Sequence, residues 1–103
     1  MFLDKITDYL FQSKTILENT VKNKQSLNPS IIDNLRKAQY LINEANDLIK
    51  KTDYKKYYVK HDFDFLNEDI SFIIIDAFYN NVMNILDNVK NNYDVLCKAQ
   101  LGI

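Results

Sequence analysis

The side chains best suited to chemistry gather between residues 61 and 69. His61 is the only histidine, and Asp62, Asp64, Glu68 and Asp69 follow it closely. An imidazole among carboxylates could bind a divalent metal ion or transfer protons in acid–base catalysis. A metal site would need a second His or Cys nearby, which the sequence lacks. Asp62 and Asp64 instead have the position of carboxylates that cap the start of a helix, so we expect no metal site.

Nucleophilic catalysis would require His61 to activate Ser71 or Cys97. Neither residue lies in a recognisable nucleophile motif. The only glycine is Gly102, which leaves no glycine-rich loop to cradle a phosphate. The sequence therefore predicts a protein that is not an enzyme and uses no cofactor. A single cysteine also excludes an intrachain disulfide and suits a reducing compartment.

A second segment, residues 50–61, interleaves lysines with tyrosines. Proteins that bind single-stranded nucleic acid use such residues for phosphate contacts and base stacking. Arg36 is the only arginine, and an acidic helix follows, so we favour a solvated lysine turn with buried tyrosines over nucleic-acid binding. The candidate nucleic-acid residues in this alternative are Lys50, Lys51, Tyr54, Lys55, Lys56, Tyr57, Tyr58 and Lys60.

Charge is distributed unevenly along the chain. Residues 1–61 carry eleven Lys/Arg and seven Asp/Glu, whereas residues 62–103 carry two and seven, and the net charge is −1. This balance gives no overall attraction to nucleic acid or to an anionic membrane. The longest apolar run, residues 72–75, is too short to cross a bilayer, and the N-terminus lacks an export-signal pattern. We expect a cytoplasmic protein without membrane contact.

The sequence predicts that helices position the candidate residues described above. One Gly and one Pro among 103 residues leave few turn signals, which favours few and long helices in a single domain, residues 1–103. Asn28 followed by Pro29 has the form of an N-cap with proline at the first helical position. Apolar spacing predicts an all-α bundle of three principal antiparallel helices, at about 3–23, 29–51 and 64–98, with a possible short helix near 53–61.

A heptad pattern organises the third predicted helix. Nine of its ten members are apolar, and alternating spacings of three and four predict one helix with a continuous apolar edge. At about 1.5 Å per residue this helix would exceed the second one by about 15 Å, so we expect a bend or break at Asn80-Asn81 or Asn91-Asn92, or a projecting end. The members are Phe65, Glu68, Phe72, Ile75, Tyr79, Val82, Leu86, Val89, Tyr93 and Leu96.

The first half of this predicted helix carries a second apolar face. Two other helices cannot cover both faces, so we expect an uncovered row of large apolar side chains, which would be an association site. Phe11 and Tyr40 also fall off the apolar faces of their own helices. The second face consists of Leu66, Ile70, Ile73, Ile74, Ala77 and Phe78.

These patterns predict a non-catalytic protein-interaction module, such as a small cytosolic regulator, inhibitor or accessory subunit. Twelve lysines to one arginine, with abundant Asn and Ile, indicate an AT-rich coding sequence. This signature, the small size and the lack of catalytic motifs would suit a phage or mobile-element inhibitor, an immunity factor or an antitoxin. A structural homo-oligomer that uses the same seam is a further alternative. An acidic strip including Asp69 and Asp94 could steer a basic partner to the helix. The predicted partner-binding residues are Phe72, Ile75, Asp76, Tyr79, Val82, Leu86 and Asp87.

Overall fold

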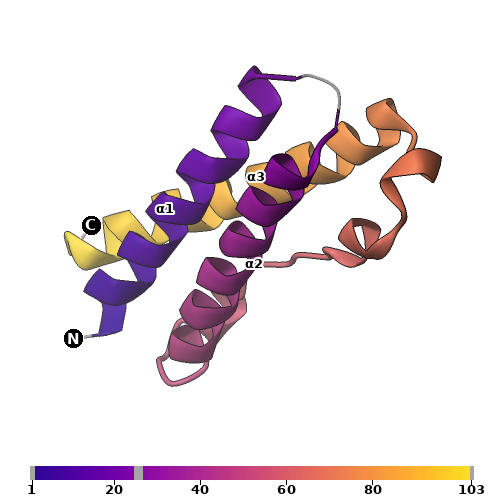
Figure 1. Ribbon diagram of the computed structural model, residues 1–103. Helices are drawn as coiled ribbons and strands as arrows, with labels where there is room; N and C mark the ends of the chain where they lie inside the picture. Colours follow the sequence, from indigo (N-terminus) through magenta and orange to yellow (C-terminus); the bar gives the residue numbers. More distant parts are fainter. Residues whose placement is uncertain (1, 25–26, 103) are drawn as a thin grey trace.

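The described part of the chain folds into three α-helices and three short 3-10 turns (Figure 1). The computed structural model describes residues 2–24 and 27–102, with the side chains of Phe2 and Ile70 outside the description. The predicted all-α fold is confirmed, and the described residues contain no β-strand. The elements are α1 (Phe2–Lys22), α2 (Pro29–Ile49), η1 (Lys55–Tyr57), η2 (Asp64–Asn67), η3 (Ile70–Phe72) and α3 (Ile75–Gln100).

The first two helices follow their local sequence signals closely. Pro29 is the first residue of α2, and Asn28 is its N-cap. The Asn28 side-chain oxygen accepts a hydrogen bond from the Ile31 amide at 3.1 Å, which satisfies an amide that the helix itself leaves unpaired. The bounds of α1 and α2 agree with the predicted ranges to within two residues.

Helix α1 packs extensively against both α2 and α3, and Figure 1 shows α3 crossing behind the other two helices. At the far end of α3, the Gln100 side chain accepts a hydrogen bond from Thr7 at 3.2 Å and donates one to Asp4, near the start of α1. Helix α1 is therefore antiparallel to α3 as well as to α2. Consequently α2 and α3 run in the same general direction, because residues 50–74 cross back to the end of the bundle where α2 began.

This crossing segment, residues 50–74, belongs to the core as well as to the surface. Val59, Phe63 and Leu66 are buried in the same cluster as the helix side chains. The buried Asn46 side chain of α2 accepts a hydrogen bond from the Val59 amide at 2.9 Å and donates one to the Val59 carbonyl at 3.1 Å. Both backbone groups are thus satisfied away from water. The pair of bonds fastens the crossing segment to α2.

The third helix begins eleven residues later than predicted. Residues 64–74 form η2, η3 and extended backbone instead of the first turns of a long helix. Asp62 accepts a hydrogen bond from the Asp64 amide, and Asp69 accepts one from the Ser71 amide, each at 2.9 Å. Such side-chain turns compete with helix formation. The prediction that Asp62 and Asp64 cap the long helix is wrong, because these bonds close a local turn.

The later start reduces the predicted mismatch in length between the second and third helices from about 15 Å to about 7 Å. Helix α3 has 26 residues and α1 has 21, so they span about 39 and about 32 Å. Helix α3 continues through Asn80-Asn81 and Asn91-Asn92 without interruption. It ends before Gly102, whose φ of 76° lies in the left-handed region that glycine adopts most easily. The predicted short helix near 53–61 is reduced to the single turn η1.

Candidate functional site: an exposed apolar corner

The heptad seam divides into a buried part and an exposed part. Tyr79, Val82 and Leu86, which were predicted to bind a partner, have exposed fractions of 0%, 0% and 8% and belong to the core. This correction follows from the arrangement of the helices, because α1 packs along α3 and covers its apolar edge. Val89 and Leu96 continue the same buried edge.

The exposed part lies where η3 leads into α3. Phe72 is 80% exposed and Ile75 is 45% exposed, as a partner-binding role would require. Ile74 is 73% exposed, although its pattern assigned it to the second apolar face and not to the seam. We refer to Phe72, Ile74 and Ile75 as the apolar corner. Asp76 and Asp87, the remaining predicted partner residues, are exposed as well.

A groove with a volume of about 210 Å³ adjoins the apolar corner. Aromatic rings form part of its lining, and they pack in sequence: Phe65 meets Phe78 edge-on at 5.2 Å, and Phe78 meets Tyr79 edge-on at 5.4 Å. Edge-to-face contacts of this kind hold rings in fixed orientations. Buried rings of the core thus hold the aromatic lining of the groove in place. Its lining residues are Phe65, Glu68, Phe72, Ile73, Ile74, Ala77, Phe78 and Asn81.

The signal for this corner was present in the sequence as four consecutive apolar residues, 72–75. A helix turns by about 100° per residue, so it cannot bury four consecutive side chains on one face. In the structure Ile73 is half-buried, while Phe72, Ile74 and Ile75 remain exposed. Ile70 was assigned to the second face, but its side chain lies outside the described residues. Leu66 and Phe78 of that face are buried.

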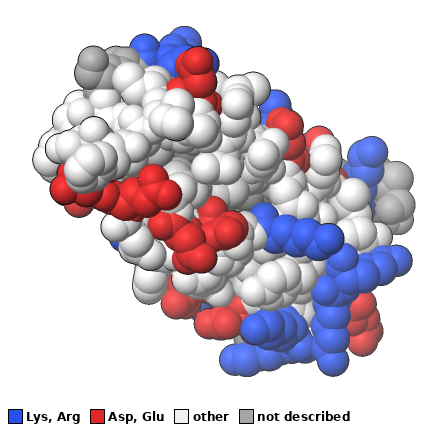
Figure 2. Space-filling view, turned by 90° about the vertical axis from the view of Figure 1, so that its right-hand side faces the viewer, with Lys and Arg blue, Asp and Glu red and all other residues white. Residues whose placement is uncertain are grey.

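Acidic residues flank the apolar corner in the chain. Between residues 61 and 89 the chain has six Asp/Glu and no Lys or Arg. Glu68 lines the groove, Asp69 immediately precedes η3, and Asp76 lies in the first turn of α3. We refer to these three exposed carboxylates as the acidic rim. Figure 2 shows a broad uncharged area above a band of acidic side chains, whereas lysines gather at the lower right of this face.

His61 lies in a different, polar environment. It is half-buried, its ring centroid is 5.6 Å from that of Phe63, and burial lowers its pKa below 6.5, while Asp62 opposes this shift. His61 Nδ1 and Asn88 Oδ1 have no hydrogen-bond partner within the described part of the chain. Both residues line a pocket of about 450 Å³ with Lys60, Asp62, Asn81, Asn84 and Ile85.

The residues considered for catalysis do not assemble around His61. The residues that line its pocket include neither Ser71 nor Cys97. Cys97 lines a separate pocket with Phe11 and Tyr93. In the described ranges, no three His, Cys, Asp or Glu side chains form a group that could hold a metal ion.

The lysine-tyrosine segment has part of the arrangement that the sequence predicted. Tyr54 and Tyr57 are half-buried and pack against the core, and Tyr58 is exposed. Lys50 Nζ lies 5.4 Å from the Tyr58 ring centroid, and Lys56 Nζ lies 5.1 Å from that of Tyr57. The nucleic-acid hypothesis stays a prediction, with Tyr58 as its exposed stacking ring. Lysines with exposed side chains here are Lys50, Lys51, Lys55, Lys56 and Lys60.

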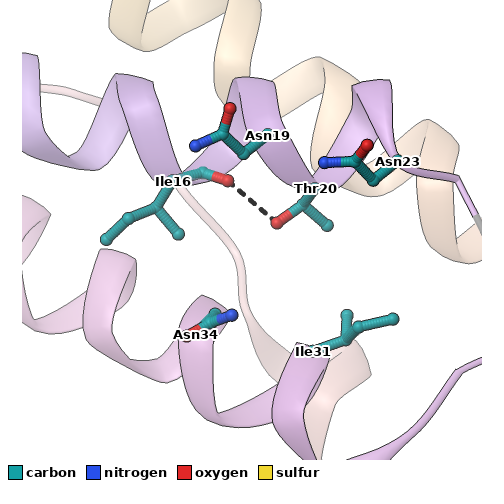
Figure 3. A pocket seen from close by; sticks show the side chains of 6 residues that line it. All are labelled: Ile16, Asn19, Thr20, Asn23, Ile31 and Asn34. Carbon is teal, nitrogen blue, oxygen red and sulfur yellow. Dashed lines mark hydrogen bonds between the residues drawn. The ribbon is translucent and has the colours of Figure 1, made fainter.

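Two further surface features are a pair of exposed aromatic side chains and a pocket between α1 and α2. Phe11 and Tyr40 are exposed, as their positions predicted, but Phe11 packs 6.0 Å from Tyr93, and Lys14 Nζ lies over both rings at 5.5 and 5.1 Å. A pocket of about 300 Å³ separates the end of α1 from the start of α2 (Figure 3). Its lining lacks ionisable groups and consists of Ile16, Asn19, Thr20, Asn23, Ile31 and Asn34.

Comparisons with known proteins give no match from which a function could be taken. No family model, curated protein or solved structure matches the chain. Among the described helices, none combines the length and apolar character that crossing a membrane would require.

Proposed function

We propose that this protein is a non-catalytic protein-interaction module, a small cytosolic regulator, inhibitor or accessory subunit that binds its partner through the apolar corner. The observation that carries the proposal is the exposure of Phe72, Ile74 and Ile75 at one junction. Isolated exposed apolar residues are common in proteins, but a contiguous group beside a groove is typical of an interaction site.

The energetics of burial support this role. Covering one large apolar side chain contributes about 1.5–3 kcal/mol, so the three residues of the corner offer several kcal/mol to a partner. Large apolar residues that enter a well-packed contact tend to dominate binding energy. The core of the bundle is already filled by other side chains. A second molecule could therefore cover the corner without any rearrangement of the fold.

The surroundings of His61 support the non-catalytic part of the proposal. Three of the seven residues that line the pocket of its imidazole are asparagines, and none has a hydroxyl or a thiol. Amides neither act as nucleophiles nor accept protons near neutral pH, whereas nucleophilic catalysis needs a hydroxyl or thiol within hydrogen-bond reach of the base.

Site-specific photocrosslinking would test the proposed surface. A photoreactive phenylalanine analogue would replace Phe72 in one variant and Tyr40 in another, since Tyr40 is also 61% exposed but lies on α2. In lysate of the source cells, we expect a discrete protein adduct from position 72, its loss when Ile74→Ser is added, and none from position 40. Absence of the adduct at position 72, or equal adducts at both positions, would contradict the proposal.

A further inference from the structure

The chemistry of the acidic rim narrows the kind of partner that the apolar corner can accept. Glu68 contributes to the lining of the groove itself, so a bound segment would pass within contact distance of a carboxylate. Asp69 is fixed by its hydrogen bond to the Ser71 amide, and Asp76 lies between Ile75 and Ala77 in the chain. Apolar and acidic groups are thus interleaved over one small surface.

A second copy of the chain is disfavoured as the occupant. Two identical corners that meet about a two-fold axis would bring both acidic rims together, because such an interface uses the same patch on each subunit. Like charges placed opposite each other at an interface oppose association. Residues 61–89 contain no Lys or Arg, and the Arg36 guanidinium, which donates a hydrogen bond to the Asn67 side chain at 2.6 Å, could offset only part of this repulsion.

The negative charge of the acidic rim also argues against an anionic surface as the occupant of the apolar corner. Phosphates of nucleic acid or of an acidic membrane would meet the carboxylates of the acidic rim beside the corner, and charges closer than the Debye length of about 8 Å at physiological salt are only partly screened. Most of the basic side chains of this face lie to the lower right of the uncharged area, and others lie at its upper edge (Figure 2). A cationic segment that also carries apolar side chains would instead complement both features.

We propose that the groove beside the apolar corner binds a Lys/Arg-rich amphipathic segment of another protein, which inserts an apolar side chain between Phe72 and Ala77 and places its cations on the acidic rim. This inference rests on the proposed function and specifies the chemistry of the partner. Apolar burial supplies most of the affinity, and the rim supplies selectivity and fast association.

Matched synthetic peptides would test the inference. Two helical peptides share a leucine stripe, and the flanking positions carry lysine in one and glutamate in the other. A third peptide keeps the lysines and replaces the leucines with serine. Binding is measured by calorimetry at low and physiological salt, and amide chemical shifts of Ile73, Ile74 and Ala77 locate the contact.

We expect the leucine-lysine peptide to shift the amides of the corner and to bind about tenfold more tightly than the leucine-glutamate peptide, as three surface ion pairs would give. The difference should shrink at higher salt. Substituting Glu68→Gln, Asp69→Asn and Asp76→Asn together should abolish it. The control, Glu18→Gln with Asp33→Asn and Asp47→Asn, makes the same charge change at exposed sites on α1 and α2 and should preserve it.

Four outcomes would overturn the inference. Equal affinity of both leucine peptides at the corner would refute the cationic partner and leave the proposed function standing. Equal binding by the serine peptide would show that charge alone suffices. Dimerisation of the protein that Ile74→Ser abolishes would identify a second copy as the occupant. Absence of binding by all three peptides, together with an adduct in the crosslinking test, would reject the partner chemistry alone.

Discussion

The two parts of the heptad pattern, residues 72–75 and residues 79–96, show how one sequence signal leads to opposite environments. Tyr79, Val82 and Val89 are fully buried, whereas Phe72 and Ile75 are exposed, although the spacing between these residues is regular throughout. Helix α1 covers the later part. The earlier part lies in η3 and at the start of α3.

This difference shows that periodicity identifies apolar side chains that could share a face and does not identify what covers them. In the later part the spacing coincides with a real helix, so the side chains form one edge and α1 packs on it. In the earlier part the same spacing extends over 3-10 turns and extended backbone, where it has no single face. The corner is exposed because the helix required by the pattern is absent there.

The largest expected effect is a difference in the free energy of unfolding between substitutions in the two parts of the heptad pattern. Tyr79→Ala should lower the free energy of unfolding by about 3–5 kcal/mol, because it removes a buried aromatic side chain and leaves a cavity. Phe72→Ala should change it by less than about 0.5 kcal/mol, because that ring is exposed. Urea denaturation of both variants measures the contrast. Similar losses would show that the exposed part contributes to the core.

The next effect concerns the attachment of the crossing segment that carries the corner. Asn46→Ala should destabilise the fold by about 1–3 kcal/mol for each of the two Val59 backbone groups that it leaves unpaired. Asn43→Ala, at an exposed position of the same helix, is the matched control and should be neutral or slightly stabilising. Amide hydrogen exchange should show faster exchange at Val59 in the first variant. Unchanged exchange would mean that other contacts hold the segment.

A smaller effect concerns Ile74 and Ile75 of the apolar corner. Serine at either position should weaken partner binding, but the two substitutions should differ in their effect on stability. Ile74 is the N-cap of α3, with φ −82° and ψ 115°, but it has no polar atom for the helix amides. Ile74→Ser should raise the free energy of unfolding by about 1 kcal/mol through a capping bond, while it weakens partner binding. Ile75→Ser removes a neighbouring apolar side chain without creating a cap, and should weaken binding with no gain in stability. Retained binding in both variants would exclude the corner as the contact surface.

The smallest expected effect is the pH dependence contributed by His61. Burial lowers its pKa in the folded state below the usual value of 6.5, so the unfolded state binds the proton more readily. Stability should therefore decrease as pH falls below about 6.5 and level off below the pKa of the folded state. Asp62 raises the pKa of His61 and so opposes part of this effect, and Lys60 lines the same pocket. His61→Gln should flatten this dependence between pH 8 and 5, and an unchanged profile would assign it to other groups.

The sequence predicted much of the fold and less of the site. Helices α1 and α2 could be predicted because Asn28, Pro29 and regular apolar spacing act locally. The start of α3 could not, because the turns at Asp62 and Asp69 compete with helix formation on nearly equal terms. Asn46 was missed altogether, since its importance depends on Val59, thirteen residues away in the chain.

By itself the sequence determined the helical class, the ends of the first two helices, the acidic character of residues 62–103 and the presence of more apolar residues than two neighbouring helices could cover. These properties depend on composition and on contacts within a few residues. Only the tertiary structure decided which apolar residues stay uncovered, because burial depends on which distant segment packs on each face. Helix α1 covers the edge from Tyr79 to Leu96, and the turn before α3 leaves Phe72, Ile74 and Ile75 in solvent.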